Sequence, residues 1–97
     1  MLNRLAKIKD VKFGFNSNLF GLSIQISGDS WETIGSYVYD TSINSLEYNG
    51  MTDMLENIQK LLKDANVKTI DKLLNKPVEC TFDGLILKGF RILTEVL

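Results

Sequence analysis

Histidine is absent from the 97 residues, and cysteine and proline occur once each. Without histidine the chain lacks the commonest general acid or base near neutral pH and the commonest metal ligand. The single thiol, Cys80, cannot form an internal disulfide, and it alternates with Val78 and Phe82 in an apolar pattern typical of a buried residue. These absences predict a protein that is not an enzyme and that uses no metal and no cofactor.

Two further signatures of catalysis or nucleotide binding are missing. The seven glycines form neither the G-x-G-x-x-G nor the G-x-x-x-x-G-K-[ST] pattern. Paired carboxylates can hydrolyse bonds without histidine, but the closest pairs, Asp29 with Glu32 and Asp53 with Glu56, are typical of a solvated turn and a helix start.

Basic residues are missing from the middle of the chain. Between Phe13 and Gln59 there are six acidic residues and no Lys or Arg, whereas the first 12 residues carry four basic residues and the chain from Lys60 onward carries seven. The net charge of −1 predicts no attraction to nucleic acid or to an anionic membrane. Any anion site must draw on the N-terminal strand or on the C-terminal third.

Long apolar runs are also missing, since no stretch approaches the ~20 residues that span a bilayer. The N-terminal Met1–Arg4 segment does not resemble a signal peptide. A hydrophobic content of 44% is ordinary for a globular protein. We therefore expect one domain over residues 1–97, soluble in a reducing cytoplasm.

Alternating apolar and polar residues predict three strands in the N-terminal half, at residues 6–15, 21–27 and 31–39. Asn16–Asn18 and Gly28–Ser30 separate them and are typical of turns. We expect an antiparallel meander. Residues 40–50 show no clear period and are predicted to form a loop.

Residues 51–65 have the apolar spacing of an amphipathic helix, with Asp53 as a predicted cap. A short helix is expected from Thr69 to Leu74, with Thr69 as N-cap and with Ile70, Leu73 and Leu74 packing inward. A strand beginning at Pro77, an Asp83–Gly84 turn and a strand over residues 85–97 predict a C-terminal hairpin. The predicted fold class is α+β, an antiparallel sheet packed with one amphipathic helix and one short helix.

The last predicted strand is apolar in both phases, which favours a homo-oligomer because a second copy would cover the second face. The alternative is a bulge at Gly89 that switches the side-chain phase and lets a monomer bury both sets.

Candidate ligand-binding residues follow from charge and from aromatic character. Arg91 lies in an apolar strand, and either binds a ligand or pairs internally with Glu79 or Glu95. Lys88 and Asn75 are further candidates for holding an anion. Trp31, beside a turn, and Phe13 are candidates for stacking on a planar base.

The segments LLKDANV (61–67), LNKPVECTF (74–82) and LKGFRILTEVL (87–97) resemble a family of small phage and prophage proteins that is similar to the viral Thoeris anti-defence sponges. The resemblance covers roughly the last 40 residues. It implies an oligomer in the host cytoplasm that sequesters a cyclic ADP-ribose-type nucleotide without cleaving it. Arg91, Lys88 and Asn75 would hold phosphate or ribose, and aromatic residues would stack on adenine.

A different class of function follows from the acidic middle segment. A protein-binding inhibitor, similar to an anti-CRISPR protein, would present Asp29, Glu32 and Glu47 to a basic groove of its target. An accessory phage protein without a ligand is the third alternative.

Overall fold

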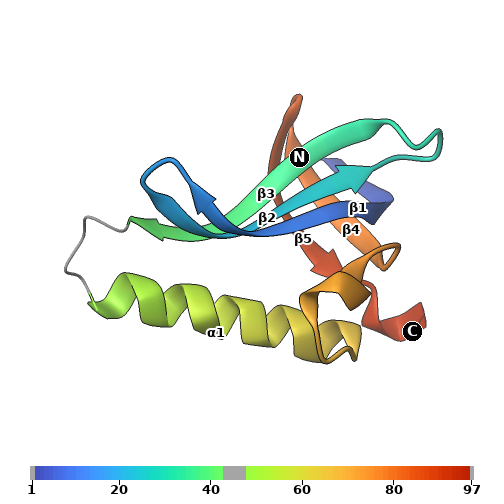
Figure 1. Cartoon of the computed structure of the whole chain (residues 1–97). Coiled ribbons are helices and arrows are strands. Elements are labelled where there is room, and N and C mark those ends of the chain that lie inside the picture. The colour runs from blue at the N-terminus through green and yellow to red at the C-terminus, as the bar shows by residue number, and fades with distance from the viewer. Residues whose placement is uncertain (1, 43–47, 97) are drawn as a thin grey trace.

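The computed structural model describes residues 2–42 and 48–96, and the predicted α+β fold is confirmed. One helix packs against an antiparallel sheet (Figure 1). The elements are β1 (Leu2–Asn16), β2 (Leu19–Ser27), β3 (Thr33–Ser42), α1 (Tyr48–Ala65), the 3-10 helix η1 (Ile70–Leu73), β4 (Pro77–Asp83), β5 (Ile86–Ile92) and the 3-10 helix η2 (Thr94–Val96).

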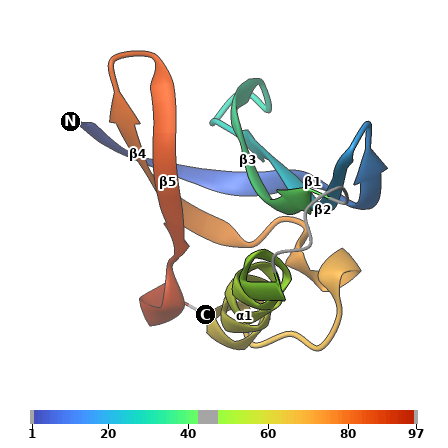
Figure 2. The same cartoon turned by 90° about the vertical axis from the view of Figure 1, so that its left-hand side faces the viewer.

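Strand β1 joins the two predicted parts of the sheet. The strand order is β3-β2-β1-β4-β5, so the N-terminal meander and the C-terminal hairpin form one five-stranded sheet. The first half of β1 pairs with β4 through Leu2–Lys7, and the second half pairs with β2 as far as Asn16. Lys9 forms a β-bulge between these two halves, because the register with β2 shifts between Ile8 and Asp10. Figure 2 shows β1 passing from the hairpin to the meander.

The sheet is curled, so that its two outer strands approach each other. Leu87 of β5 lies over Gly35 of β3, and the rings of Tyr37 and Phe90 are 5.6 Å apart in an edge-to-face arrangement. The sheet is therefore a partly open barrel, with α1 along one side (Figures 1 and 2).

The core lies between the inner face of the sheet and α1. Met54, Ile58, Leu61 and Ala65 form the buried stripe of the helix. The sheet contributes the fully buried side chains Ile8, Leu22, Ile24, Ile26, Val78 and Cys80. Burial of each large aliphatic side chain stabilises the fold by roughly 1.5–3 kcal/mol.

The start of α1 differs from the prediction, and its C-terminal end agrees with it. Asp53 lies within the helix and cannot be its N-cap. At the C-terminus Asn66 has a φ of 57°, its N–H donates to the Lys63 carbonyl, and the Val67 N–H donates to the Leu62 carbonyl. This is a Schellman motif, in which a residue with positive φ ends the helix.

Other boundaries were also wrong, including the start of β1, which lies at Leu2 and not at residue 6. Trp31 lies in a turn with a φ of 64°, so β3 begins at Thr33. The predicted loop over residues 40–50 contains the end of β3 and the start of α1, and its residues 43–47 lie outside the described ranges. The last strand ends at Ile92. Leu74, which was predicted to pack inward, is exposed.

A bulge in β5 explains the two apolar phases of the last strand. Thr81 pairs with Gly89 and Phe82 pairs with Leu87, so Lys88 is the extra residue. Leu87, Phe90 and Ile92 therefore all pack against the core. The phase switch expected as the alternative to an oligomer is present, and the strand pattern no longer requires a second copy.

No helix among the described residues is long and apolar enough to cross a membrane.

Candidate functional site

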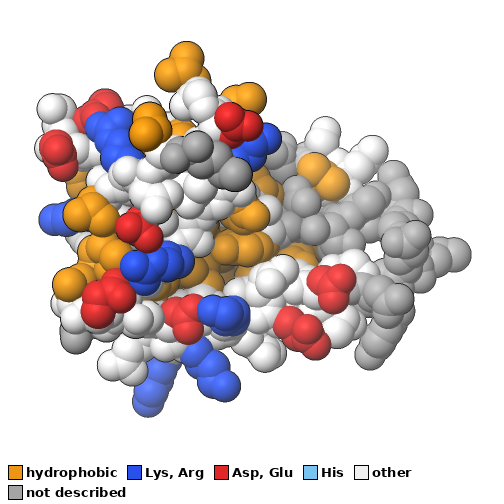
Figure 3. Space-filling view, turned by 180° about the vertical axis from the view of Figure 1, so that it is seen from behind, with side chains coloured by type: hydrophobic (Ala, Val, Ile, Leu, Met, Phe, Trp, Pro, Cys, Tyr) orange, Lys and Arg blue, Asp and Glu red, His pale blue; other side chains and the backbone are white. Residues whose placement is uncertain are grey.

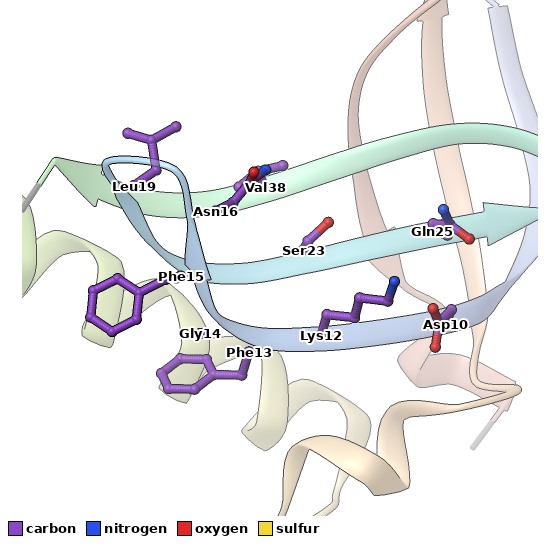
Figure 4. A pocket seen from close by; sticks show the side chains of 11 residues that line it. Asp10, Lys12, Phe13, Gly14, Phe15, Asn16, Leu19, Ser23, Gln25 and Val38 are labelled. Atoms are coloured by element: carbon purple, nitrogen blue, oxygen red, sulfur yellow. The ribbon is translucent and has the colours of Figure 1, made fainter.

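A hollow of about 670 Å³ lies on the outer face of the meander, opposite the core (Figure 4). Four cross-strand pairs of β1 and β2 line it, namely Asp10 with Gln25, Lys12 with Ser23, Gly14 with Gly21 and Asn16 with Leu19. Val38 of β3 borders it. Its volume falls within the ~300–1,000 Å³ that is usual for small-molecule sites.

The glycine pair creates the hollow. Directly opposed residues of an antiparallel pair point to the same face, and at Gly14 and Gly21 that face carries no side chain. A Cβ on Gly14 would meet no atom within 4 Å. Its φ of 148° is rare for other residues, and the hairpin beyond it curls over the outer face, as Figures 1 and 4 show. The exposed backbone of the two glycines therefore forms the floor of the hollow, below the turn of the β1–β2 hairpin.

Charged and amide groups surround this floor. Within the described part of the chain, the side chains of Lys12 and Asp10 take part in no hydrogen bond or ion pair. The Asn16 and Gln25 amides are exposed and offer both donors and acceptors. The hollow therefore presents one ammonium, one carboxylate and two amides to a ligand.

The aromatic rings near the hollow point away from it. Phe13 and Phe15 border the hollow, but their rings lie on the side of β1 that faces α1 (Figure 4). Both rings contact Phe20, at centroid distances of 5.1 and 4.9 Å. The stacking surface predicted at Phe13 therefore lies on the opposite side of the sheet from Lys12 and Ser23.

Arg91 has two internal partners. Its Nε donates to Glu79 Oε1 at 3.0 Å, and its Nη1 donates to Glu95 Oε1 at 3.1 Å. The hydrogen bond to Glu79 is the main cause that raises the pKa of Arg91, and Glu95 adds to it. The internal pairing that the sequence left open is present, and with both carboxylates. The Nε and Nη1 of Arg91 are therefore engaged by two carboxylates, which repel an anionic ligand.

A smaller hollow of about 180 Å³ lies beside Arg91, between α1 and the outer strands. Tyr39, Phe90, Lys60 and Asp64 line it, and Lys60 is paired with Asp64 at 2.6 Å. Burial raises the pKa of Tyr39 to about 12. Figure 3, the view from behind, shows acidic and basic side chains interspersed on this face of the molecule, not gathered into a basic patch.

Trp31 lies in the turn between β2 and β3, and its side chain is 49% exposed. Lys9 Nζ donates to the Trp31 carbonyl and to Thr33 Oγ1, both at 3.1 Å. Glu32 accepts from Arg4 at 3.0 Å and from the Ser30 N–H at 2.9 Å. Hydrogen bonds from backbone N–H groups, chiefly its own, lower the pKa of Glu32.

Asn75 and Lys88 each occupy a special position in the backbone, Asn75 in a turn and Lys88 in a β-bulge. Asn75 has a φ of 67°, and its N–H donates to the Ile8 carbonyl at 2.8 Å, which holds the turn before β4 against β1. Lys88 is the exposed bulge residue of β5.

The five predicted site residues are not brought together. Phe13 borders the larger hollow, Arg91 borders the smaller one, and Trp31, Lys88 and Asn75 border neither. Sequence reasoning missed the glycine pair, although a signal was present. Gly14 and Gly21 lie at equal distances from the Ser17–Asn18 turn, so a two-residue hairpin places them opposite each other.

Cys80 is fully buried, and burial raises the pKa of its thiol to about 11. Among residues 2–42 and 48–96 there is no group of three or more Cys, Asp or Glu side chains that could hold a metal ion. No protein-family model, curated protein or solved structure matches this chain.

Proposed function

We propose that this protein binds a small nucleotide-class ligand in the hollow on the outer face of β1, β2 and β3, and releases it unchanged. The observation that carries the proposal is the bare Gly14–Gly21 pair next to the free ammonium of Lys12. A planar base can lie on a floor without side chains, and an ammonium attracts a phosphate. The amides of Asn16 and Gln25 offer hydrogen bonds to the polar edges of the ligand.

Two further observations support this location over the Arg91 region. The larger hollow has more than three times the volume of the smaller one, about 670 against about 180 Å³. By analogy at the level of the fold, partly open five-stranded barrels of the OB type bind ligands on the face of their second and third strands, and the hollow includes four residues of β2 and Val38 of β3.

The resemblance to the Thoeris anti-defence sponges supports a specific ligand within this class, a cyclic ADP-ribose-type immune signal. Sequestration would need affinity and no turnover, and it would take place in the host cytoplasm. Among the described residues that line the hollow, Lys12 is the one cation, and it stands against the carboxylate of Asp10, so the hollow of a single copy matches one phosphate better than two.

Titration calorimetry with AMP, ADP-ribose and cyclic ADP-ribose tests the proposal. Lys12→Ala should weaken binding about 10- to 100-fold, because a hydrogen bond to a charged group contributes ~1.5–3 kcal/mol. Ser23→Leu should fill the hollow and abolish binding. Lys88→Ala is the matched control, since Lys88 is also an exposed lysine without a partner in the described part of the chain. A panel without any binding, or equal losses in Lys12→Ala and Lys88→Ala, would refute it.

The second candidate, an inhibitor that binds a protein through its acidic residues, has less support. Glu32 is paired with Arg4, and Lys9 lies against the same turn as Asp29. Glu47 lies outside the described residues. Loss of inhibition on charge reversal of Asp29 and Glu32 would favour this candidate.

A further inference from the structure

Asp10 lies on the same face of β1 as Gly14, four residues before it in the strand. Alternate residues of a strand are about 6.4–6.8 Å apart, so Asp10, Lys12 and Gly14 follow one another at equal steps along one side of the hollow. Gln25, Ser23 and Gly21 follow in register along the other side. The hollow therefore has an acidic end at Asp10, a cationic step at Lys12 and then the bare glycine pair, beyond which Asn16 and Leu19 close the other end.

The acidic end restricts the chemistry of the ligand. A carboxylate close to a bound phosphate weakens binding by repulsion. An ionised carboxylate only accepts hydrogen bonds, so Asp10 favours binding where the ligand brings donors to it. Asp10 is partly buried and, among the described residues, has neither an ion-pair partner nor a hydrogen-bond donor. Its acceptor positions are therefore available to a ligand.

We infer that the hollow selects ribonucleotides, with the Asp10 carboxylate accepting hydrogen bonds from the ribose hydroxyls. The base lies on Gly14 and Gly21. The ribose, which joins the base to the phosphate, lies over the next step of the hollow with its 2′- and 3′-hydroxyls toward Asp10, and the phosphate contacts the end of the Lys12 side chain. A carboxylate that receives ribose hydroxyls is an established way of reading this sugar. The inference rests on the proposed function, because it assigns a role to a second residue of the same hollow.

Removal of one hydroxyl should be costly in this arrangement. A ligand without the 2′-hydroxyl leaves part of the carboxylate without a donor in a partly enclosed site. We expect 2′-deoxy-AMP to bind at least tenfold more weakly than AMP. In Asp10→Ala the ratio of the two dissociation constants should fall to about one, and 2′-deoxy-AMP should bind as tightly as it binds wild type, or more tightly.

The experiment measures both dissociation constants, for AMP and 2′-deoxy-AMP, on wild type, Asp10→Ala, Asp29→Ala and Lys12→Ala. Asp29 is an exposed acid in the turn after β2 and is the matched control, which should keep the wild-type ratio. Lys12→Ala should weaken both nucleotides about equally. Circular dichroism checks that each variant is folded.

The outcomes separate the two claims. Equal affinity of wild type for the two nucleotides, together with weaker binding by Lys12→Ala, would overturn the ribose inference and leave the proposed function standing. A tenfold preference that persists in Asp10→Ala would overturn the role of Asp10. Absence of binding of either nucleotide would overturn the proposed function and the inference together.

Discussion

The side chain of Leu87 on β5 lies directly on Gly35 of β3, where an added Cβ would approach Leu87 Cδ2 to 2.9 Å and Leu87 Cβ to 3.1 Å. These two residues bring the outer strands of the sheet into contact, and β1, β2 and β4 connect those strands through hydrogen bonds. Glycine at position 35 thus allows Leu87 to pack this closely on β3.

Gly35→Ala should lower the free energy of unfolding by about 1–3 kcal/mol, because it overpacks this contact. In a Leu87→Ala background the same change should cost less, since the Cδ2 methyl group at 2.9 Å is gone and only the Cβ at 3.1 Å remains. Urea unfolding of the two single variants and the double variant gives the coupling energy. Additive effects would show that the strands do not depend on this contact.

Stability should fall at alkaline pH. Burial raises the pKa of Cys80 from 9.0 to about 11 and that of Tyr39 from 10.0 to about 12. A raised pKa in the folded state means that the stabilisation is complete below the unfolded pKa and is lost as pH rises through the folded pKa. Urea midpoints should therefore be constant up to about pH 8.5 and decline from about pH 9 to 12. Cys80→Ala combined with Tyr39→Phe should flatten this decline.

Lys9 should hold the turn that carries Trp31, because its ammonium donates to the Trp31 carbonyl and to Thr33 Oγ1. Lys9→Met should lower the fluorescence anisotropy of this single tryptophan while global stability changes little. Lys7→Met is the control, since Lys7 is a neighbouring exposed lysine of β1 whose ammonium has no partner within the described ranges. An identical anisotropy in both variants would argue against this role.

Asn75 should tolerate glycine and resist alanine. Its φ of 67° lies in the left-handed region, where a residue with a Cβ costs roughly 1–2 kcal/mol and asparagine and glycine are preferred. We expect Asn75→Gly to retain the unfolding midpoint and Asn75→Ala to lower it, with no change in nucleotide affinity for Asn75→Gly. Weaker nucleotide binding by Asn75→Gly would restore the ligand role expected from the sequence.

Arg91→Ala should leave nucleotide affinity unchanged, because the guanidinium is shared by Glu79 and Glu95 and lies outside the larger hollow. Calorimetry beside the Lys12→Ala variant makes the comparison direct. A larger loss for Arg91→Ala than for Lys12→Ala would place the ligand in the smaller hollow and reject the site proposed above.

Local patterns predicted the elements well where one face of each is buried. The alternation around Leu22, Ile24 and Ile26 identified β2, and the spacing of Met54, Ile58 and Leu61 identified α1. Helix and strand boundaries were less predictable, because Trp31 and Asp53 suit more than one local conformation. Trp31 is aromatic and typical of a strand, yet the hydrogen bonds of its turn hold it at a positive φ.

The candidate site was not predictable from residue types alone. Arg91 and Phe13 have side chains typical of a ligand site, but tertiary structure brings Glu79 and Glu95 to Arg91 and turns the Phe13 ring toward Phe20. The hollow depends instead on Gly14 and Gly21, which have no side chain to draw attention to them. Its chemistry follows from register, which is a property of two strands together.

By itself the sequence determined the fold class, the strand and helix periods and the absence of imidazole, because these depend on residue identity and on neighbours close in the chain. Only the tertiary structure decided that β1 joins the meander to the hairpin, that Lys88 shifts the phase of β5 and that Arg91 is paired. These features arise from contacts between residues far apart in the chain, and the free energies of such contacts depend on register and curvature that no local pattern contains.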